Sequence, residues 1–195
     1  MKLDIKRLIK RLFLALALPL YLAYRSIILI ADPDSTFRTF SQFLSLIPGK
    51  TGVFLRAAFY HLACTDTSDE ISIGFLTVLS HRDTTIRKGV YIGPQSNIGK
   101  CHIGENTLLG SGVHILSGKT QHNFSDIDSP IQEQGGTYIK VKIGENCWLG
   151  NGSIIMADVA SHCIVAAGSV SPKPLAEEAS IYAGNPAKFL KRRFS

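Results

Sequence analysis

The chain has 195 residues, 45% of them hydrophobic and 18% charged, which fits one sizeable folded domain with additional segments. The net charge of +6 lies at the two ends: residues 1–25 hold six Lys and Arg against one Asp, and residues 188–195 hold four and no acid. This argues against a nucleic-acid-binding protein, which spreads positive charge over a folded face. The four cysteines show neither a C-x-x-C pair nor close spacing, so we expect buried thiols rather than disulfides or a zinc site.

The first predicted element is a membrane-seeking helix. Residues 2–11 mix basic and aliphatic residues, and residues 12–24 are wholly apolar. A transmembrane helix needs about 20 apolar residues, which the run reaches only by including Pro19 and Arg25. A signal peptide would need a small-residue cleavage site, and no clear one follows. We therefore expect residues 1–31 to associate with a membrane surface, with a true span and a signal peptide as alternatives.

Two shorter helices are predicted next. Asp32-Pro33 is a typical helix start, and Pro48-Gly49 ends that helix. Residues 52–64 then predict a second amphipathic helix. The aromatic residues on both helices predict core packing, with an extended membrane-facing surface as the alternative.

A six-residue period organises the following part of the chain. The period fits neither an α-helix nor a lone strand, and it is typical of a hexapeptide β-helix, whose aliphatic residues point inward. The glycine that follows most of these residues suits a corner, as do Asn97, Asn106, Asn146 and Asn151. The periodic residues are Ile86, Ile92, Ile98, Ile103, Leu109 and Ile115, and then Ile143, Leu149 and Ile155.

The repeat is interrupted once, by a polar segment that we expect to project as a loop over residues 117–140. The predicted organisation is therefore helices over residues 1–66, a mainly β coil over 67–175 and a basic tail over 176–195. Within the tail, residues 187–194 predict a short helix with Pro186 in its first turn.

The hexads, a long loop with a histidine, and the stretches IGENCWLGNG (143–152), AAGSV (166–170) and AGNPAK (183–188) resemble the hexapeptide-repeat acyltransferases. The similarity is to the galactoside, maltose and xenobiotic acetyltransferase branch. Residues 40–62 and 117–136 resemble its exopolysaccharide and lipopolysaccharide O-acetyltransferases. The resemblance covers residues 37–193. It implies a three-sided left-handed parallel β-helix of roughly 18 residues per coil. It also implies a homotrimer that binds acetyl-CoA between subunits, with each loop reaching over the neighbour.

The resemblance also implies roles for single residues. His122 matches the catalytic histidine, and Trp148 matches an indole that lines the active-site tunnel. The residues that match cofactor contacts are Asn151, Ala167 and Lys173 along the pantetheine arm, and Lys188 and Lys191 near the phosphates. The chain departs from the family pattern in a short turn after Val159, in Pro172 where a threonine is usual, and in Lys188 where an arginine is frequent.

Acetyl transfer to a hydroxyl needs a base, and a histidine with a pKa near 6.5 suits that task at neutral pH. His122 is the best candidate because it lies in the polar loop with acids nearby, and Asp126, Asp128 and Glu133 remain alternatives for orienting its ring. His81, Asn123 and Asp126 are candidates for binding the acceptor. We expect His102, His114 and His162 to be structural or surface residues, and we expect no metal.

The function that these features favour is an O-acetyltransferase that moves an acetyl group from acetyl-CoA to a sugar hydroxyl of a polysaccharide or its lipid-linked precursor. We expect it at the cytoplasmic face of the inner membrane. One alternative is another acceptor, such as serine, an amino sugar or a xenobiotic. The other is a non-catalytic β-helix or a zinc enzyme that uses His81, His102 and His122.

Overall fold

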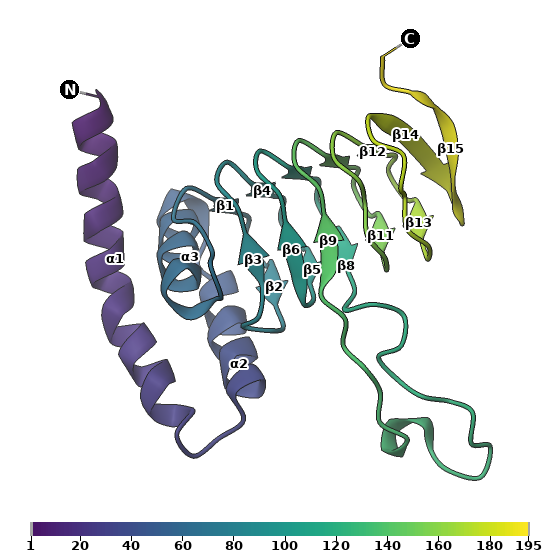
Figure 1. Cartoon of the computed structure of the whole chain (residues 1–195). Helices are drawn as coiled ribbons and strands as arrows, with labels where there is room; N and C mark the ends of the chain where they lie inside the picture. Colours follow the sequence, from purple (N-terminus) through teal and green to yellow (C-terminus); the bar gives the residue numbers. More distant parts are fainter. Residues whose placement is uncertain (1, 195) are drawn as a thin grey trace.

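The structure is a computed structural model that describes residues 2–194, with side chains from residue 5 onward. Three helices form one end of the molecule: α1 (Lys2–Ile27), α2 (Pro33–Ser45) and α3 (Gly49–Ala63). A coil of short strands follows, and a hairpin forms the far end (Figure 1). Met1, the first residue of the predicted membrane segment, and Ser195 lie outside the described residues.

The strands stack into three parallel faces, which confirms the predicted parallel coil. The first face holds β1 (Ser72–Ile73), β4 (Tyr91–Ile92), β7 (Leu108–Leu109), β10 (Trp148–Leu149) and β12 (Ile164–Val165), followed by the hairpin. The second face holds β2 (Val78–Leu79), β5 (Asn97–Ile98), β8 (His114–Ile115), β11 (Ile154–Ile155) and β13 (Val170–Ser171). The third face holds β3 (Thr85–Ile86), β6 (Cys101–Ile103) and β9 (Val141–Ile143), continued by bridges at Val159 and Leu175.

The core of the coil is a set of aliphatic ladders. On the first face Ile92 lies opposite Leu109 and Leu109 opposite Leu149, and all three side chains are buried. On the second face Ile98 lies opposite Ile115 in the same way. Each fully buried side chain of this kind contributes about 1.5–3 kcal/mol. The six-residue period of the sequence is therefore the spacing from one face to the next.

The corners depend on close backbone approach and on left-handed residues. A Cβ at Gly93 would lie 2.6 Å from the carbonyl carbon of Gly110 in the next coil, so only glycine fits there. Asn106 and Asn146 adopt φ angles of 56° and 50°, as expected for corner asparagines. Asn97 differs from the expectation, because it lies within β5 with its side chain exposed.

The helices close the first coil, and a buried arginine attaches them. The α2 helix begins as predicted, with the Ser35 amide donating to Asp32 Oδ1 at 2.7 Å. From α3, Arg56 Nη1 donates to the carbonyls of Leu44 (2.9 Å) and Ile47 (2.8 Å) at the C-terminal end of α2. Its Nε donates to the carbonyl of Ile73 in β1 at 3.0 Å. One side chain thus joins α3, α2 and the coil.

The aromatic faces of the helices form a core, as the sequence predicts. Tyr24 of α1 packs edge-on against Phe37 of α2 and Phe59 of α3, and all three rings are buried. Ser41 and Tyr60 share a buried hydrogen bond of 2.7 Å, and the Leu79 amide donates to Ser41 Oγ at 2.8 Å. The aromatic core is therefore tied to the second face of the coil.

The predicted C-terminal helix is wrong. Residues 180–192 form a hairpin of β14 (Ser180–Gly184) and β15 (Ala187–Arg192). β14 pairs in parallel with β12, so it covers the edge that the last coil would leave open. Gly184, with a φ of 102°, allows the turn into β15. β14 pairs with the open edge of the last coil, and β15 pairs with β14. These pairings depend on residues distant in sequence, and they override the helical signal of Pro186 and the basic residues.

The helix α1 does not meet the requirements of a membrane span. None of the helices within residues 2–194 is both long enough and apolar enough to cross a bilayer. The alternative of a true span is therefore not supported for these helices.

Replacing Arg56 by Met should lower the free energy of unfolding by about 3 kcal/mol, because three carbonyls each lose a charged donor at roughly 1 kcal/mol per bond. Urea denaturation followed by circular dichroism measures this loss. The control is Arg87→Met, whose exposed ion pair with Asp66 should contribute less than about 1 kcal/mol. Equal losses in the two variants would contradict the joining role of Arg56.

Candidate active site

The segment that leaves the coil carries the predicted base. Between β8 and β9 the chain runs out and back as a ribbon, with the Ile139 amide bonded to the Ser117 carbonyl (2.9 Å) and the Thr137 amide to the Thr120 carbonyl (2.7 Å). A short 3-10 turn, Ile131–Glu133, lies near its tip. The loop projects well beyond the coil (Figure 1). His122 lies on its outgoing arm, is exposed, and borders a hollow of about 400 Å³ with Thr120, Asn123 and Phe124.

The acids of the loop shape its tip. Asp126 accepts hydrogen bonds from Ser129 Oγ (2.6 Å) and from the Asp128 amide (3.0 Å), and these bonds hold the pKa of its carboxyl below the ordinary value. Gln134 ties the same turn together by donating to the Asp126 carbonyl at 2.7 Å. Within residues 5–194, no side chain hydrogen-bonds the imidazole of His122. The contacts within one chain therefore do not select Asp126, Asp128 or Glu133 as the acid that orients His122.

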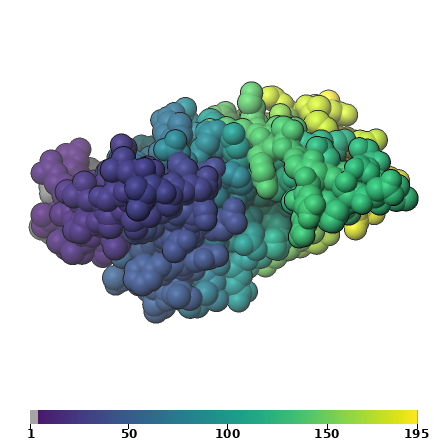
Figure 2. All heavy atoms as spheres, turned by 90° about the horizontal axis from the view of Figure 1, so that it is seen from below, coloured from purple at the N-terminus to yellow at the C-terminus, as the bar shows by residue number. Residues whose placement is uncertain are grey.

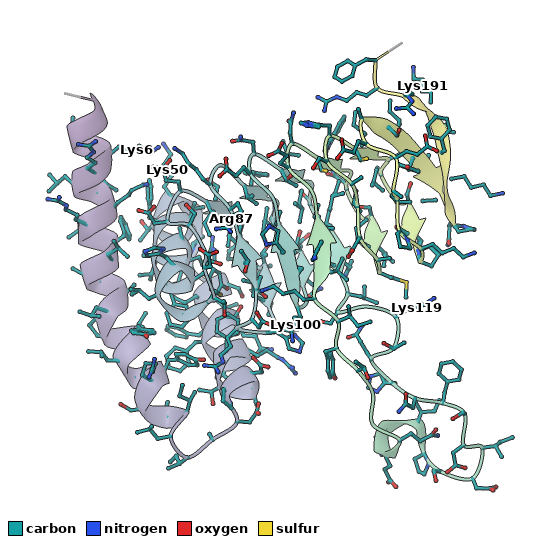
Figure 3. The ribbon with its side chains drawn as sticks, in the orientation of Figure 1. Lys6, Lys50, Arg87, Lys100, Lys119 and Lys191 are labelled. Atoms are coloured by element: carbon teal, nitrogen blue, oxygen red, sulfur yellow. The ribbon has the colours of Figure 1, made fainter. Side chains whose placement is uncertain are left out.

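Three charged residues fix the root of the loop. Lys140, on the returning arm, donates to Asp83 Oδ1 at 2.7 Å and to Thr85 Oγ1 at 3.1 Å. Lys100 lies 3.2 Å from the other oxygen of Asp83, and its place beside the loop root is visible in Figure 3. Partial burial acts to raise the pKa of Asp83, but the hydrogen bonds from both lysines outweigh it, so the pKa lies below its usual value.

His81 lies beneath the returning arm. Its ring is 5.0 Å from that of Tyr138, and Nδ1 is 2.9 Å from Ser80 Oγ. Burial lowers the pKa of His81, which keeps the ring neutral at pH 7. In this chain the contacts of His81 support the loop, and the side chain does not border the hollow at His122. Its role as an acceptor-binding residue stays a prediction.

The predicted cofactor residues occupy the outer surface of the coil. Trp148 points outward from the first face, between Leu108 and Ile164, and 53% of its surface is exposed. Asn151 and Ala167 occupy the same corner one coil apart, where the Gly168 amide bonds the Asn151 carbonyl at 2.9 Å. These three residues form a continuous strip along one face and its corner.

The predicted basic contacts lie elsewhere on the chain. Lys173 occupies the corner between the second and third faces, the corner from which the loop emerges, and Ser171 Oγ donates to its carbonyl at 2.9 Å. Lys188 and Lys191 lie on β15, opposite Ala183 and Ile181, and Figure 3 shows Lys191 on the hairpin far from the loop. A single chain therefore does not bring the cofactor strip and His122 together.

The histidines proposed for zinc are separate. His81 is under the loop, His102 is on the third face and His122 is on the outgoing arm. Among the described residues, no group of three or more His, Cys, Asp and Glu is placed to hold a metal ion. A hollow of about 740 Å³ lies on the third face beside His102, Arg87 and Lys142, away from the predicted site residues.

One polar hollow was not predicted from the sequence. It has a volume of about 380 Å³ and lies where α2, the second face and the loop root meet. Arg38 and Gln42 line it from α2, and Asn97 and His114 line it from the coil. Gln121, the residue before His122 on the loop, also lines it. Only the folded chain brings α2 beside this face, so no sequence spacing could have revealed the hollow.

The four cysteines are buried and unpaired with one another, as expected. Burial raises the pKa of Cys101 to about 12 and that of Cys147 to about 11. Neither thiol is a nucleophile at neutral pH. This leaves direct attack by the acceptor as the simpler chemistry.

Comparison with known proteins agrees with this architecture. Residues 83–117 match the family model of the bacterial transferase hexapeptide (six repeats). The matched residues run from just before β3 to just after β8, so the match lies in the first half of the coil. It is 35% identical, over 116 residues, to a probable macrolide acetyltransferase of Lysinibacillus sphaericus. The match covers 54% of this chain and 64% of that relative, less than two thirds of its length.

Solved structures show the same fold. A maltose O-acetyltransferase from Clostridium difficile 630 aligns with a TM-score of 0.67 and 20% identity, over 83% of this chain and 89% of that one. A hexapeptide-repeat acetyltransferase from Vibrio cholerae aligns with a TM-score of 0.64 and 16% identity, over 85% and 96%. These likenesses support the left-handed sense expected for the coil.

Replacing Lys140 by Met should free the returning arm. We expect faster amide hydrogen exchange over residues 137–140, by roughly tenfold, because the bond to Asp83 is charge-assisted. Lys142→Met, an exposed change two residues further on in β9, is the control. The pKa of Asp83 is lowered on folding, so the anchor is present above its ordinary value of 3.8 and is lost as the pH falls through the lower folded value. Unchanged exchange in Lys140→Met would contradict the anchoring role.

Proposed function

We propose that the protein is an acetyl-CoA-dependent O-acetyltransferase whose general base is His122. The observation that carries the proposal is the position of this exposed imidazole on the projecting loop of a hexapeptide-repeat coil. The similarity to a probable macrolide acetyltransferase supports acetyl transfer as the reaction class. The exposed strip of Trp148, Asn151 and Ala167 supports a long donor that lies along the coil.

In this mechanism the acceptor hydroxyl attacks directly. His122 removes the hydroxyl proton as the oxygen attacks the thioester carbonyl, and a backbone amide at a coil corner stabilises the oxyanion. The C–S bond then breaks, and the imidazolium returns the proton to the leaving thiolate of coenzyme A. The products are an O-acetyl ester and the free thiol.

The site is completed by a second copy of the chain in a homotrimer. The arrangement is supported by two exposed apolar surfaces, one on the coil and one on the loop. One is the outward stripe of the first face, and the other is the loop tip, where Ile127 is 96% exposed. The stripe contains Tyr91, Leu108 and Trp148, and the loop tip contains Phe124, Ile127 and Ile131. A loop that lies over the neighbouring face covers both surfaces and carries His122 toward the neighbour's Trp148.

The acceptor that we favour is a sugar hydroxyl of a polysaccharide or its lipid-linked precursor, acetylated at the cytoplasmic face of the inner membrane, where acetyl-CoA is available. The polar hollow beside Gln121, lined by amide, hydroxyl and guanidinium groups, suits such an acceptor. A xenobiotic hydroxyl is the second candidate, because the relative of Lysinibacillus sphaericus is a probable macrolide acetyltransferase.

Replacing His122 by Ala should lower kcat for acetyl transfer by about 10² to 10⁴, the usual contribution of a general base, and leave coenzyme A binding unchanged. Release of the free thiol on addition of an acceptor measures the rate. His61→Gln, an exposed change on α3, is the control and should keep full activity. Full activity in folded His122→Ala would remove this residue from the mechanism.

Replacing Lys188 and Lys191 by Ala should raise KM for acetyl-CoA without a matching change in KM for the acceptor. Each charge-assisted contact to phosphate contributes about 1.5–3 kcal/mol, so the expected rise is at least tenfold. Lys50→Ala, on the helical end, is the control. An unchanged KM for acetyl-CoA would mean that the two lysines do not contact the donor.

A further inference from the structure

Helix α1 has one face packed and one face uncovered. Its inner face buries Ala17 and Tyr24, and Phe13 stacks on Phe54 of α3 at 5.2 Å. Lys10 on the same side pairs with Asp69 at 3.2 Å and with Glu70 at 3.0 Å. No other described element covers the outer side of α1 in Figure 1.

The uncovered face is apolar along the whole helix. At 3.6 residues per turn six of its large residues fall within an arc of about 140°, and Leu18, which is 45% exposed, lies about 40° outside that arc. Their exposed fractions run from 42% to 68%, which is far more than a helix packed within its own fold would leave. These residues are Ile5, Leu8, Leu12, Leu16, Leu22 and Ile27. The strip continues past the end of the helix, where Leu29 and Ile30 are 81% and 93% exposed.

The charges of α1 lie at the margins of this strip. Arg7, Arg11 and Arg25 are exposed and lie along one edge of it, whereas Lys10 faces the coil. No Asp or Glu occurs from Ile5 to Ile27. A wide apolar arc with a purely basic edge is the pattern of a helix that lies in the plane of a bilayer surface, with arginine side chains reaching the phosphates.

The charges of α1 distinguish two candidates for covering this face, a second copy of the helix and an anionic bilayer. A second copy of α1 packed on it would bring two arginine edges together, and each helix has only one acidic residue, Asp4, against its three arginines. An anionic bilayer supplies both requirements, acyl chains for the strip and phosphates for the edge. The helices of residues 2–194 do not include a span, so the contact is with one leaflet.

We propose that α1 lies flat in the headgroup layer of an anionic bilayer, with the strip from Ile5 to Ile30 among the acyl chains and Arg7, Arg11 and Arg25 on lipid phosphates. The remainder of the molecule stays in water. Seen from below, the helical end and the loop lie at opposite ends of the molecule (Figure 2), so membrane contact through α1 leaves the loop uncovered. This membrane contact of α1 does not depend on which reaction the protein catalyses.

The test is cosedimentation of the purified full chain with vesicles of phosphatidylcholine, with and without phosphatidylglycerol. Wild type should bind the anionic vesicles. The triple variant Leu8→Ser, Leu12→Ser and Leu16→Ser should lose roughly tenfold in partitioning for each leucine. Arg7→Gln with Arg11→Gln should weaken binding to anionic vesicles by about fivefold per arginine and leave neutral vesicles unaffected.

The control is Leu190→Ser, an exposed leucine on the far hairpin, which should bind as wild type does. All substituted side chains are exposed, so thermal unfolding should be unchanged, and circular dichroism checks this. Two results would overturn the proposal: wild type that stays in the supernatant with anionic vesicles, or a leucine triple variant that binds as tightly as wild type. A triple variant that changes oligomeric state in solution while vesicle binding persists would assign the face to a second copy.

Discussion

Register between successive coils is the constraint on which the structure depends. Each short strand offers one inward residue, so a slip of one position would place polar side chains in the core and expose the aliphatic ones. The ladder from Ile92 through Leu109 to Leu149 keeps this register even though a long loop is inserted between the second and third faces of one coil. The loop is tolerated because it leaves and returns at a corner, where no ladder residue is displaced.

The same constraint determines how the two ends of the coil are finished. An open coil end exposes unpaired strand backbone, which invites aggregation. At one end the Arg56 guanidinium donates hydrogen bonds to the Ile73 carbonyl of the first coil and to the Leu44 carbonyl at the end of α2. The aromatic helices cover the opening of the coil there. At the other end β14 pairs with β12. The helical end, required for this closure, also presents the outward face of α1.

The sequence predicts what is local and repeated. The aliphatic period predicted the coil, Asp32 and Pro48 predicted the limits of α2, and the interruption after Ile115 predicted the loop. The failures are non-local. Residues 187–192 carry helical signals but pair as a strand, because β14 takes up the free edge of the last coil. Arg56 and the hollow at Gln121 arise only when the helices dock on the coil.

The catalytic assignment has the same limit. We propose His122 as the base because of its place on the loop, yet its surroundings in one chain contain neither the Trp148 strip nor a bonded acid among the described residues. The central claim is that a neighbouring copy completes the site. Native mass spectrometry of the full chain with coenzyme A tests this claim most directly. The account predicts a trimer that takes up coenzyme A; a monomer that binds coenzyme A equally well, or a trimer that binds none, would contradict it.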